Sequence, residues 1–221
     1  MIYSKRSRPV RRVILTALAL IIWFYTQSLL GVRPAPANGI DDRLHQLTAE
    51  LNTYFLAHGS AANALLIASS ALIDLLAIFL LLRWLFGESV RPFLGLFVLM
   101  LLRQVVQAFC ALPTPPNMIW RYPGFPSLLV TYSVAGDFFF SGHTAIAVFA
   151  ATEVARLRKN WLTGLALLVA VFEILTVLVL RAHYTMDVFT GIVAALLVAA
   201  TIDRISAPID RFVDQREDSP A

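Results

Sequence analysis

The feature that most constrains this chain is a series of six apolar segments, near 13–32, 61–82, 92–112, 139–155, 161–180 and 185–203. A bilayer crossing takes roughly 20 apolar residues, and the stretches between the segments are too short for a separate water-soluble domain. The charged share of 14% supports this interpretation, because a soluble domain carries about 25%. The sequence therefore excludes a soluble globule and a disordered chain, and predicts an all-α, six-transmembrane-helix bundle over residues 13–205.

The distribution of basic residues predicts how the bundle is oriented. If the loops are numbered alternately, 13 of the 18 Lys and Arg residues fall on one side and 4 on the other, with Arg103 inside a segment. Basic loops stay cytoplasmic, so we expect a cytoplasmic basic N-terminus (1–12) and a cytoplasmic, polar, loosely ordered tail (206–221). The net charge of +4 is then a topology signal, and no nucleic-acid partner is expected.

The first apolar segment has a second interpretation. A basic stretch, an apolar run and Ala35-Pro36-Ala37 together are similar to a cleavable signal peptide. The run is long for such a signal and Pro36 is unfavourable at a cleavage site, so retention as a first membrane helix is favoured.

Two polar clusters begin the fourth and the sixth segments. Residues 136–144 read Gly-Asp-Phe-Phe-Phe-Ser-Gly-His-Thr, and residues 181–188 read Arg-Ala-His-Tyr-Thr-Met-Asp-Val. In the predicted topology both segments run from the outside inward, which places both clusters at the non-cytoplasmic face. Polar groups in membrane segments are rare and mostly functional, so these clusters predict a site.

The residue types in these clusters indicate acid–base and nucleophilic chemistry. His183 and Asp187 are four residues apart, which places them on one helix face with Cβ atoms about 5–6 Å apart. Asp187 is then expected to accept one imidazole N–H and leave the other nitrogen as nucleophile or base. His143 lies near a helix start, where unpaired N–H groups favour an anion, and it can serve as general acid and base. Two helix N-termini at one place would strengthen that anion site.

Each cluster also has a structural interpretation. The Ser-Gly-His-Thr stretch at 141–144 can serve simply as a helix cap, and the His-x-x-x-Asp stretch at 183–187 can be simply a buried hydrogen-bonded pair. Two His and two Asp are also compatible with zinc, but the paired spacings typical of metal ligands are absent. We therefore predict no metal and no cofactor.

The two motifs resemble the type 2 phosphatidic acid phosphatase (PAP2) superfamily, and within it most closely the sphingomyelin synthase family. That family carries Gly-Asp-x-x-x-Ser-Gly-His-Thr, matched at 136–144, and His-Tyr-Thr/Ser-x-Asp-Val, matched at 183–188. Weaker similarity covers Leu102-Arg103 and the Leu-Pro-Thr-Pro stretch at 112–115. The resemblance extends over residues 61–203.

The resemblance implies a metal-independent lipid phosphotransferase with six membrane helices and an active site on the periplasmic, luminal or extracellular face. It implies that His183, oriented by Asp187, attacks phosphorus to form a phosphohistidine, and that His143 protonates the leaving alcohol and then activates the acceptor. The expected partners are the bilayer, a glycerophospholipid donor and a ceramide-like lipid alcohol or water as acceptor; a homo-oligomer is allowed. The expected substrate-binding or supporting residues are Asp137, Ser141, Gly142, Tyr184, Arg103 and Arg181.

Departures from the family pattern bear on the substrate. Ala135 stands where the family has Cys. Phe189, Gly191 and small aliphatic residues stand where the family usually has aromatic residues after the second motif, so the identity of the lipid acceptor is left open. The cations with which PAP2 phosphatases hold a phosphate dianion are missing: the nearest Arg-Pro is at 91–92 with different spacing, and Val177 replaces an Arg. A phosphodiester carries one negative charge and needs fewer cations, which favours a head-group diester.

Two rival functions remain. One is a lipid phosphate or polyprenyl diphosphate phosphatase on the same fold; the other is a non-enzymatic transporter that uses intramembrane charges.

Three charged residues, Arg103, Asp74 and Glu173, lie inside segments and are expected to pair or to line a polar cavity. The four tryptophans, at 23, 84, 120 and 161, are expected in the interfacial aromatic belt.

Overall fold

The computed structural model describes residues 7–32, 40, 42–132 and 138–215, and this part of the chain is helical with irregular connections and no strand. Each predicted apolar segment contains a helix, and three further helices lie in stretches predicted as loop or tail. In chain order they are α1 (Ser7–Gly31), α2 (Arg43–Leu47), α3 (Ala49–Ala57), α4 (Gly59–Phe86), α5 (Arg91–Phe109), α6 (Gly142–Ala155), α7 (Asn160–Val179), α8 (Thr185–Thr201) and α9 (Asp203–Gln215).

The helices make this an integral membrane protein with fewer clear spans than the six predicted. By length and composition α1, α4, α5 and α7 can cross a bilayer, and α8 with α9, bent by 45°, can count as a fifth span. Helix α6 has 14 residues, about 21 Å, against a hydrocarbon core of about 30 Å. It begins at Gly142 rather than Phe139, because Ser141 caps it. The six-span count therefore stays a prediction.

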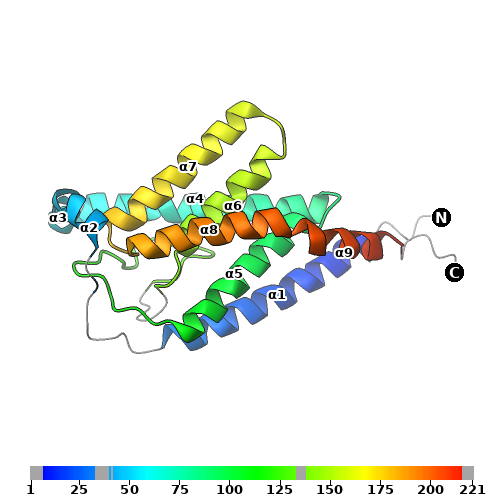
Figure 1. Cartoon of the computed structure of the whole chain (residues 1–221), viewed down its shortest axis with the longest axis horizontal. Coiled ribbons are helices and arrows are strands. Elements are labelled where there is room, and N and C mark those ends of the chain that lie inside the picture. The colour runs from blue at the N-terminus through cyan, green and yellow to red at the C-terminus, as the bar shows by residue number, and fades with distance from the viewer. Residues whose placement is uncertain (1–6, 33–39, 41, 133–137, 216–221) are drawn as a thin grey trace.

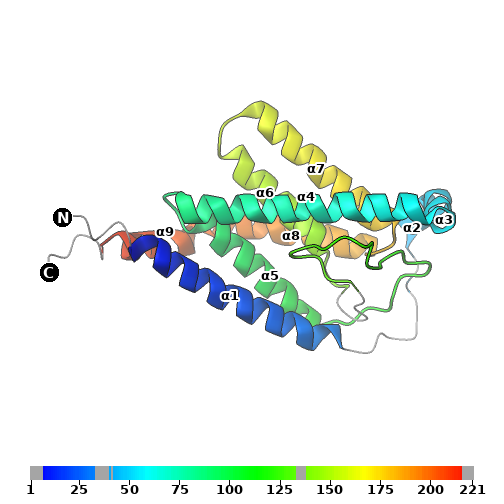
Figure 2. The ribbon, with the colours of Figure 1, turned by 180° about the vertical axis from the view of Figure 1, so that it is seen from behind.

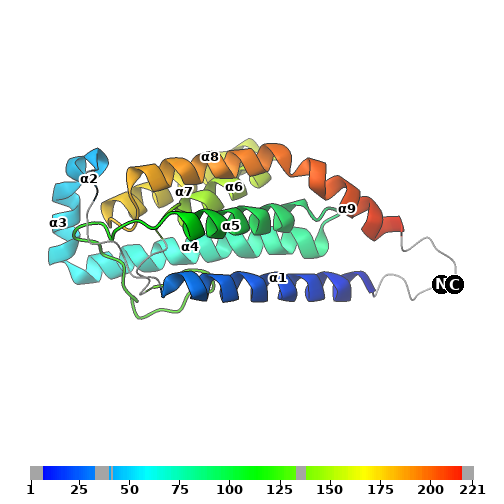
Figure 3. The ribbon, with the colours of Figure 1, turned by 60° about the horizontal axis from the view of Figure 1, so that its bottom comes forward.

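Helix α6 is short but central. It packs against α4, α5, α7 and α8, and Figure 1 shows it folding back into α7 beside the long α4 and α8. The start of α1 and the α9 helix lie at one end of the molecule, whereas α2 and α3 lie at the other (Figures 1 and 2). In Figure 3, α9 bends away from the axis of α8. Helices α6 and α8 both begin at their ends nearer to α2 and α3 (Figure 1).

Small residues allow the close packing around α6. Its inner surface includes Ala145, Ala147 and Ala150, all buried, as is common at membrane helix interfaces. A Cβ at Gly95 of α5 would lie 2.1 Å from the Phe149 ring, so only glycine lets α5 approach this fully buried ring.

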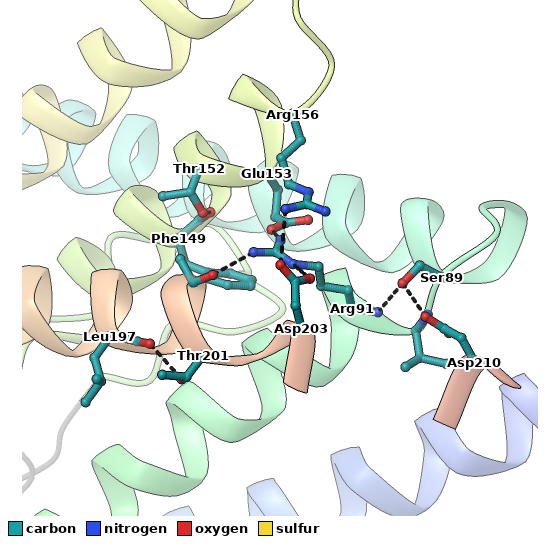
Figure 4. Close-up of polar contacts among 12 residues, drawn as sticks. Ser89, Arg91, Phe149, Thr152, Glu153, Arg156, Leu197, Thr201, Asp203 and Asp210 are labelled. Carbon is teal, nitrogen blue, oxygen red and sulfur yellow. Dashed lines mark hydrogen bonds and ion pairs between the residues drawn. The ribbon is translucent and has the colours of Figure 1, made fainter. Parts of the chain in front are cut away.

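A network of charges joins the helices at the α9 end of the molecule (Figure 4). Arg91, at the start of α5, forms a buried ion pair with Glu153 of α6, and its Nε lies 2.6 Å from Asp203 Oδ1. Its Nη2 also donates to the Ala199 carbonyl at 2.8 Å. Arg156 reaches the other oxygen of Asp203 at 3.5 Å, but half of its side chain is exposed. Arg91 therefore ties together α5, α6 and the α8–α9 junction.

Replacing Arg91 by alanine is expected to lower the free energy of unfolding by about 3 kcal/mol, because it leaves the Glu153 carboxylate buried without its partner. Arg156→Ala is the matched control, since it removes a guanidinium from the same Asp203 at an exposed position, where a pair contributes about 0–1 kcal/mol. Unfolding midpoints of both proteins in one detergent provide the comparison. Equal midpoints would contradict the role given to Arg91.

The prediction of a loosely ordered tail after residue 205 is wrong as far as residue 215. Residues 203–215 form α9, in which Ser206 is buried and Ile209 packs against the cluster around Trp84. Asp210 accepts hydrogen bonds from Ser89 Oγ and Val90 N, both at 2.7 Å. The segment is rich in charged residues, and this polar composition concealed the helical spacing of its few apolar ones.

The isolated acidic residues of the membrane segments are paired, as expected. Asp74 accepts hydrogen bonds from Ser127 Oγ and from the backbone of Leu128 and Leu129 at 2.9–3.1 Å, and Ser69 Oγ donates to Glu173 at 2.6 Å. Trp23 and Trp84 are buried among the helices, whereas Trp161 is exposed; the aromatic belt stays a prediction.

Candidate active site

A pocket of about 70 Å³ lies among α1, α4, α5 and the start of α6, and it brings the two sequence motifs together. His143 from the first motif and His183 from the second both line it. Arg103 of α5 and Gln27 of α1 contribute polar groups to the same wall, and Trp120 contributes an aromatic ring. The pocket therefore combines two imidazoles with a cation.

The two motifs meet because the backbones of α6 and α8 approach closely at one point. A Cβ at Gly191 of α8 would lie 2.8 Å from the Ser141 carbonyl oxygen, so a glycine is needed for this approach. The Ser141 N–H also donates to the Asp187 carbonyl at 3.0 Å. Gly191, one of the departures from the family pattern, thus has a packing role.

The tautomer of His183 is set by a backbone carbonyl. Its Nδ1 lies 2.8 Å from the Phe138 carbonyl oxygen, and a carbonyl only accepts, so Nδ1 carries the proton and Nε2 keeps its lone pair. Asp187 Oδ2 lies 3.7 Å from Nδ1, beyond hydrogen-bond distance, and accepts from the Tyr184 N–H at 2.8 Å. The expected imidazole–carboxylate hydrogen bond is therefore replaced by one to Phe138, with the buried Asp187 close behind.

His143 lies in the first turn of α6, at the edge of the pocket. Ser141 caps this helix by accepting from the Thr144 N–H at 3.3 Å, and the N–H groups of Gly142 and His143 have no intrahelical partner. The Trp120 ring meets the imidazole edge-on at 5.2 Å between centroids. Within the described part of the chain, the buried His143 Nε2 has no hydrogen-bond partner. This nitrogen is available for a substrate oxygen.

Arg103 places a buried positive charge beside the α6 N-terminus. Its Nε donates to the Phe140 carbonyl at 2.7 Å and its Nη1 to Gln27 Oε1 at 3.3 Å. A Cβ added at Gly142 would lie 3.4 Å from Arg103 Nε, so the guanidinium lies close to the first residue of α6. A cation and the positive end of a helix dipole favour an anion such as a phosphate.

The N-terminus of α8 does not add to this anion site, because a carboxylate already caps it. Asp42, the N-cap of α2, accepts hydrogen bonds from Thr185 N and Thr185 Oγ1, both at 2.6 Å. Burial alone would raise the pKa of Asp42, but the hydrogen bonds from Thr185 and His45 outweigh it and the pKa is lowered. The Asp42 carboxylate therefore already accepts the hydrogen bonds at the start of α8, in the place that a phosphate would take.

The remaining predicted site residues lie elsewhere. Arg181 donates to the carbonyls of Pro116 and His45 at 2.9 and 3.2 Å, and it does not line the pocket. Tyr184 is buried beside a neighbouring apolar cavity. Asp137 falls outside the described residues, and no group of metal-binding side chains was found among those described.

Sequence reasoning missed Gln27 and Trp120 as pocket residues. Gln27 is one polar residue in an apolar helix, and Trp120 is expected from sequence in the aromatic belt, although its Nε1 donates to the Thr131 carbonyl at 3.0 Å. A polar residue near the end of an apolar segment was the available signal for Gln27.

The chain matches a known protein family over most of its length. The model of the family described as AtPDCT1/2 matches residues 42–204, a range that includes both motifs. Phosphatidylcholine:diacylglycerol cholinephosphotransferase 1 of Arabidopsis thaliana is 22% identical over 192 residues, covering 87% of this chain.

The match to that relative is partial on the relative's side. The chain spans about 60% of its length, and no solved structure matches the chain. The finer placement with the sphingomyelin synthases and the PAP2 superfamily stays a prediction. Because the family model covers well over half of the residues, the chain belongs to the AtPDCT1/2 family.

Proposed function

We propose that this protein is a membrane lipid phosphotransferase that moves a phospho-head-group between diacylglycerol-like alcohols through a phosphohistidine at His183. The observation that carries the proposal is the shared pocket of His143, His183 and Arg103 in a chain whose family relative is, by its name, a cholinephosphotransferase. The pocket supplies a nucleophile, an acid–base group and a cation, which are the groups that phosphodiester transfer requires.

In the first step, His183 Nε2 attacks the phosphorus of a glycerophospholipid. The bond from phosphorus to the glycerol oxygen breaks, and protonated His143 gives its proton to that oxygen, so that diacylglycerol leaves. The head group then remains on His183 through an N–P bond. Asp187, 3.7 Å from Nδ1, stabilises the positive charge on the imidazole, and Phe138 holds the ring in place.

In the second step, an acceptor alcohol takes the place of the diacylglycerol. Neutral His143 removes the hydroxyl proton, the acceptor oxygen attacks phosphorus, and the N–P bond breaks to restore His183. The relative's name makes both the leaving alcohol and the acceptor diacylglycerols. One binding mode then serves both steps. Ceramide and water are the alternative acceptors.

A phosphodiester fits the charge of this pocket better than a phosphomonoester does. Arg103 is its one Lys or Arg among the lining residues that the structure describes, and the first turn of α6 adds a partial positive charge. Arg103 and the α6 N-terminus together balance the single negative charge of a phosphodiester.

We further propose that the pocket faces the non-cytoplasmic side, with both termini cytoplasmic, as the distribution of basic residues indicates.

The direct test uses purified protein in vesicles with phosphatidylcholine labelled in its head group and diacylglycerol of distinct acyl composition. We expect the label to appear in phosphatidylcholine that carries the acceptor's chains, as measured by lipid mass spectrometry. Parallel reactions with ceramide or without an added alcohol identify the other acceptors. Phosphate release from phosphatidic acid with no turnover of diesters would instead identify a lipid phosphatase and overturn the proposal.

A further inference from the structure

A second cavity, of about 210 Å³, lies beside the candidate pocket, among α1, α4 and α5. We name it the acyl groove and define it by its lining, which is almost wholly apolar. Trp23, Phe24 and Leu129 line both cavities, so the two spaces share a wall. The groove is further lined by Leu20, Ala77, Ile78, Leu81, Phe93, Leu96 and Leu128.

Helices α1, α4 and α5 contact one another, as Figure 2 shows from behind, and each of them contributes residues to both the pocket and the groove. On α4, Ile73 lines the pocket, and Ala77, Ile78 and Leu81 line the groove. Positions three or four residues apart share a helix face, so Ile73, Ala77 and Leu81 form one row, which spans about 12 Å.

The other two helices show the same progression. On α1, Gln27 lines the pocket and Leu20 lies at the groove, about 10 Å away along the helix. On α5, Arg103 and Met100 line the pocket, and Leu96 and Phe93 the groove. Along α1 and α5 the lining therefore changes from polar to apolar in the direction away from the two histidines, whereas on α4 it is apolar throughout.

The groove is open on its outer side. Phe24 is 41% exposed, Ile78 37% and Leu128 65%, and all three belong to its lining. An elongated apolar molecule lying in the bilayer can enter sideways here without crossing a polar barrier.

We infer that the acyl groove holds an acyl chain of the lipid substrate while its phosphorus lies between His143 and His183. The inference rests on the proposed function and names the part of the substrate that the helices α1, α4 and α5 recognise. The adjacency of the groove and the pocket, which share Trp23, Phe24 and Leu129, identifies the occupant, because a molecule that fills both must have a phosphate at one end and an apolar chain at the other. A glycerophospholipid donor meets this requirement, and the acceptor diacylglycerol fits the same two spaces with its hydroxyl at the phosphate already bound to His183.

The test narrows the groove at a residue that does not line the catalytic pocket. Ile78→Trp is expected to lower kcat/KM for long-chain phosphatidylcholine about tenfold, the effect of a typical overpacked site. Turnover of p-nitrophenyl phosphocholine, which has no acyl chain, should stay at the wild-type rate. Leu75→Trp is the matched control on the same helix, since Leu75 is 61% exposed and lines neither cavity. It should leave both rates unchanged.

Other outcomes separate the inference from the proposed function. If Ile78→Trp and Leu75→Trp both turn over long-chain lipid at the wild-type rate, the acyl groove is not the chain site, whereas loss of transfer in His183→Ala would still support the reaction. If Ile78→Trp slows both substrates equally, the chain-specific role is also overturned.

Photolabelling gives a second measurement that needs no variant. Phosphatidylcholine with a diazirine in its acyl chain should label the peptides around Leu20–Phe24 and Ala77–Leu81, and unlabelled substrate should compete. The control surface is α7, where Leu167 and Leu168 are exposed and lie outside both cavities. Equal labelling of α7, without competition, would show ordinary bilayer contact and overturn the inference.

Discussion

His183→Ala is expected to abolish head-group transfer, with a loss on the order of 10⁴-fold or more, as when other covalent nucleophiles are removed. His183 supplies the nitrogen that forms the N–P bond, and its tautomer is fixed by the Phe138 carbonyl. Lipid mass spectrometry with labelled phosphatidylcholine measures the loss. His58→Ala is the control, because this histidine is exposed and should have wild-type activity.

The covalent intermediate gives this prediction a second readout. Brief exposure of wild-type protein to head-group-labelled donor should leave acid-labile, base-stable label on the chain, and His183→Ala should carry none. A His183→Ala protein that transfers head groups at the wild-type rate, or that keeps the label, would contradict the mechanism.

His143→Gln is expected to lower transfer from phosphatidylcholine by about 10²–10⁴-fold, the usual contribution of a general acid–base. The diacylglycerol oxygen is a poor leaving group without a proton, and glutamine cannot supply one. The unpartnered Nε2 of His143 in the pocket is the group removed. The measurement compares the rate of transfer from phosphatidylcholine with the rate from an activated donor, p-nitrophenyl phosphocholine, whose leaving group needs no proton.

The His143 variant should behave differently with an activated donor. p-Nitrophenyl phosphocholine releases a stable anion that needs no proton, so we expect a near-wild-type burst of p-nitrophenol followed by accumulation of labelled His183. His183→Ala is the control and should show no burst. Equal loss of the burst in both variants would contradict the separate roles of the two histidines.

The sequence was sufficient for the features that depend on composition and local order. Six apolar segments predicted the six helices that lie within them, because a chain in lipid must satisfy its backbone hydrogen bonds internally. The motifs at 136–144 and 183–188 identified both pocket histidines, and the position of Arg103 within an apolar segment indicated either an ion pair or a polar cavity. Each of these inferences depends on residues that are neighbours in the chain.

Contacts between distant parts of the chain decided the rest. Asp42 lies 143 residues from Thr185 and caps the α8 N-terminus, which therefore does not add to the anion site. Phe138 rather than Asp187 receives the Nδ1 hydrogen bond of His183, because the irregular stretch before α6 brings its carbonyl closer. Neither contact has a periodicity or spacing that a sequence can display.

Hydropathy and helix-spaced motifs are local properties, so the order of residues was enough to predict a membrane protein and to single out the two histidines. The tertiary structure decided how the imidazoles are held, which helix end faces the pocket, and that α1, α4 and α5 align an apolar groove with it. These features arise from close packing, as at Gly191 against Ser141, and packing is defined only once all helices are in place.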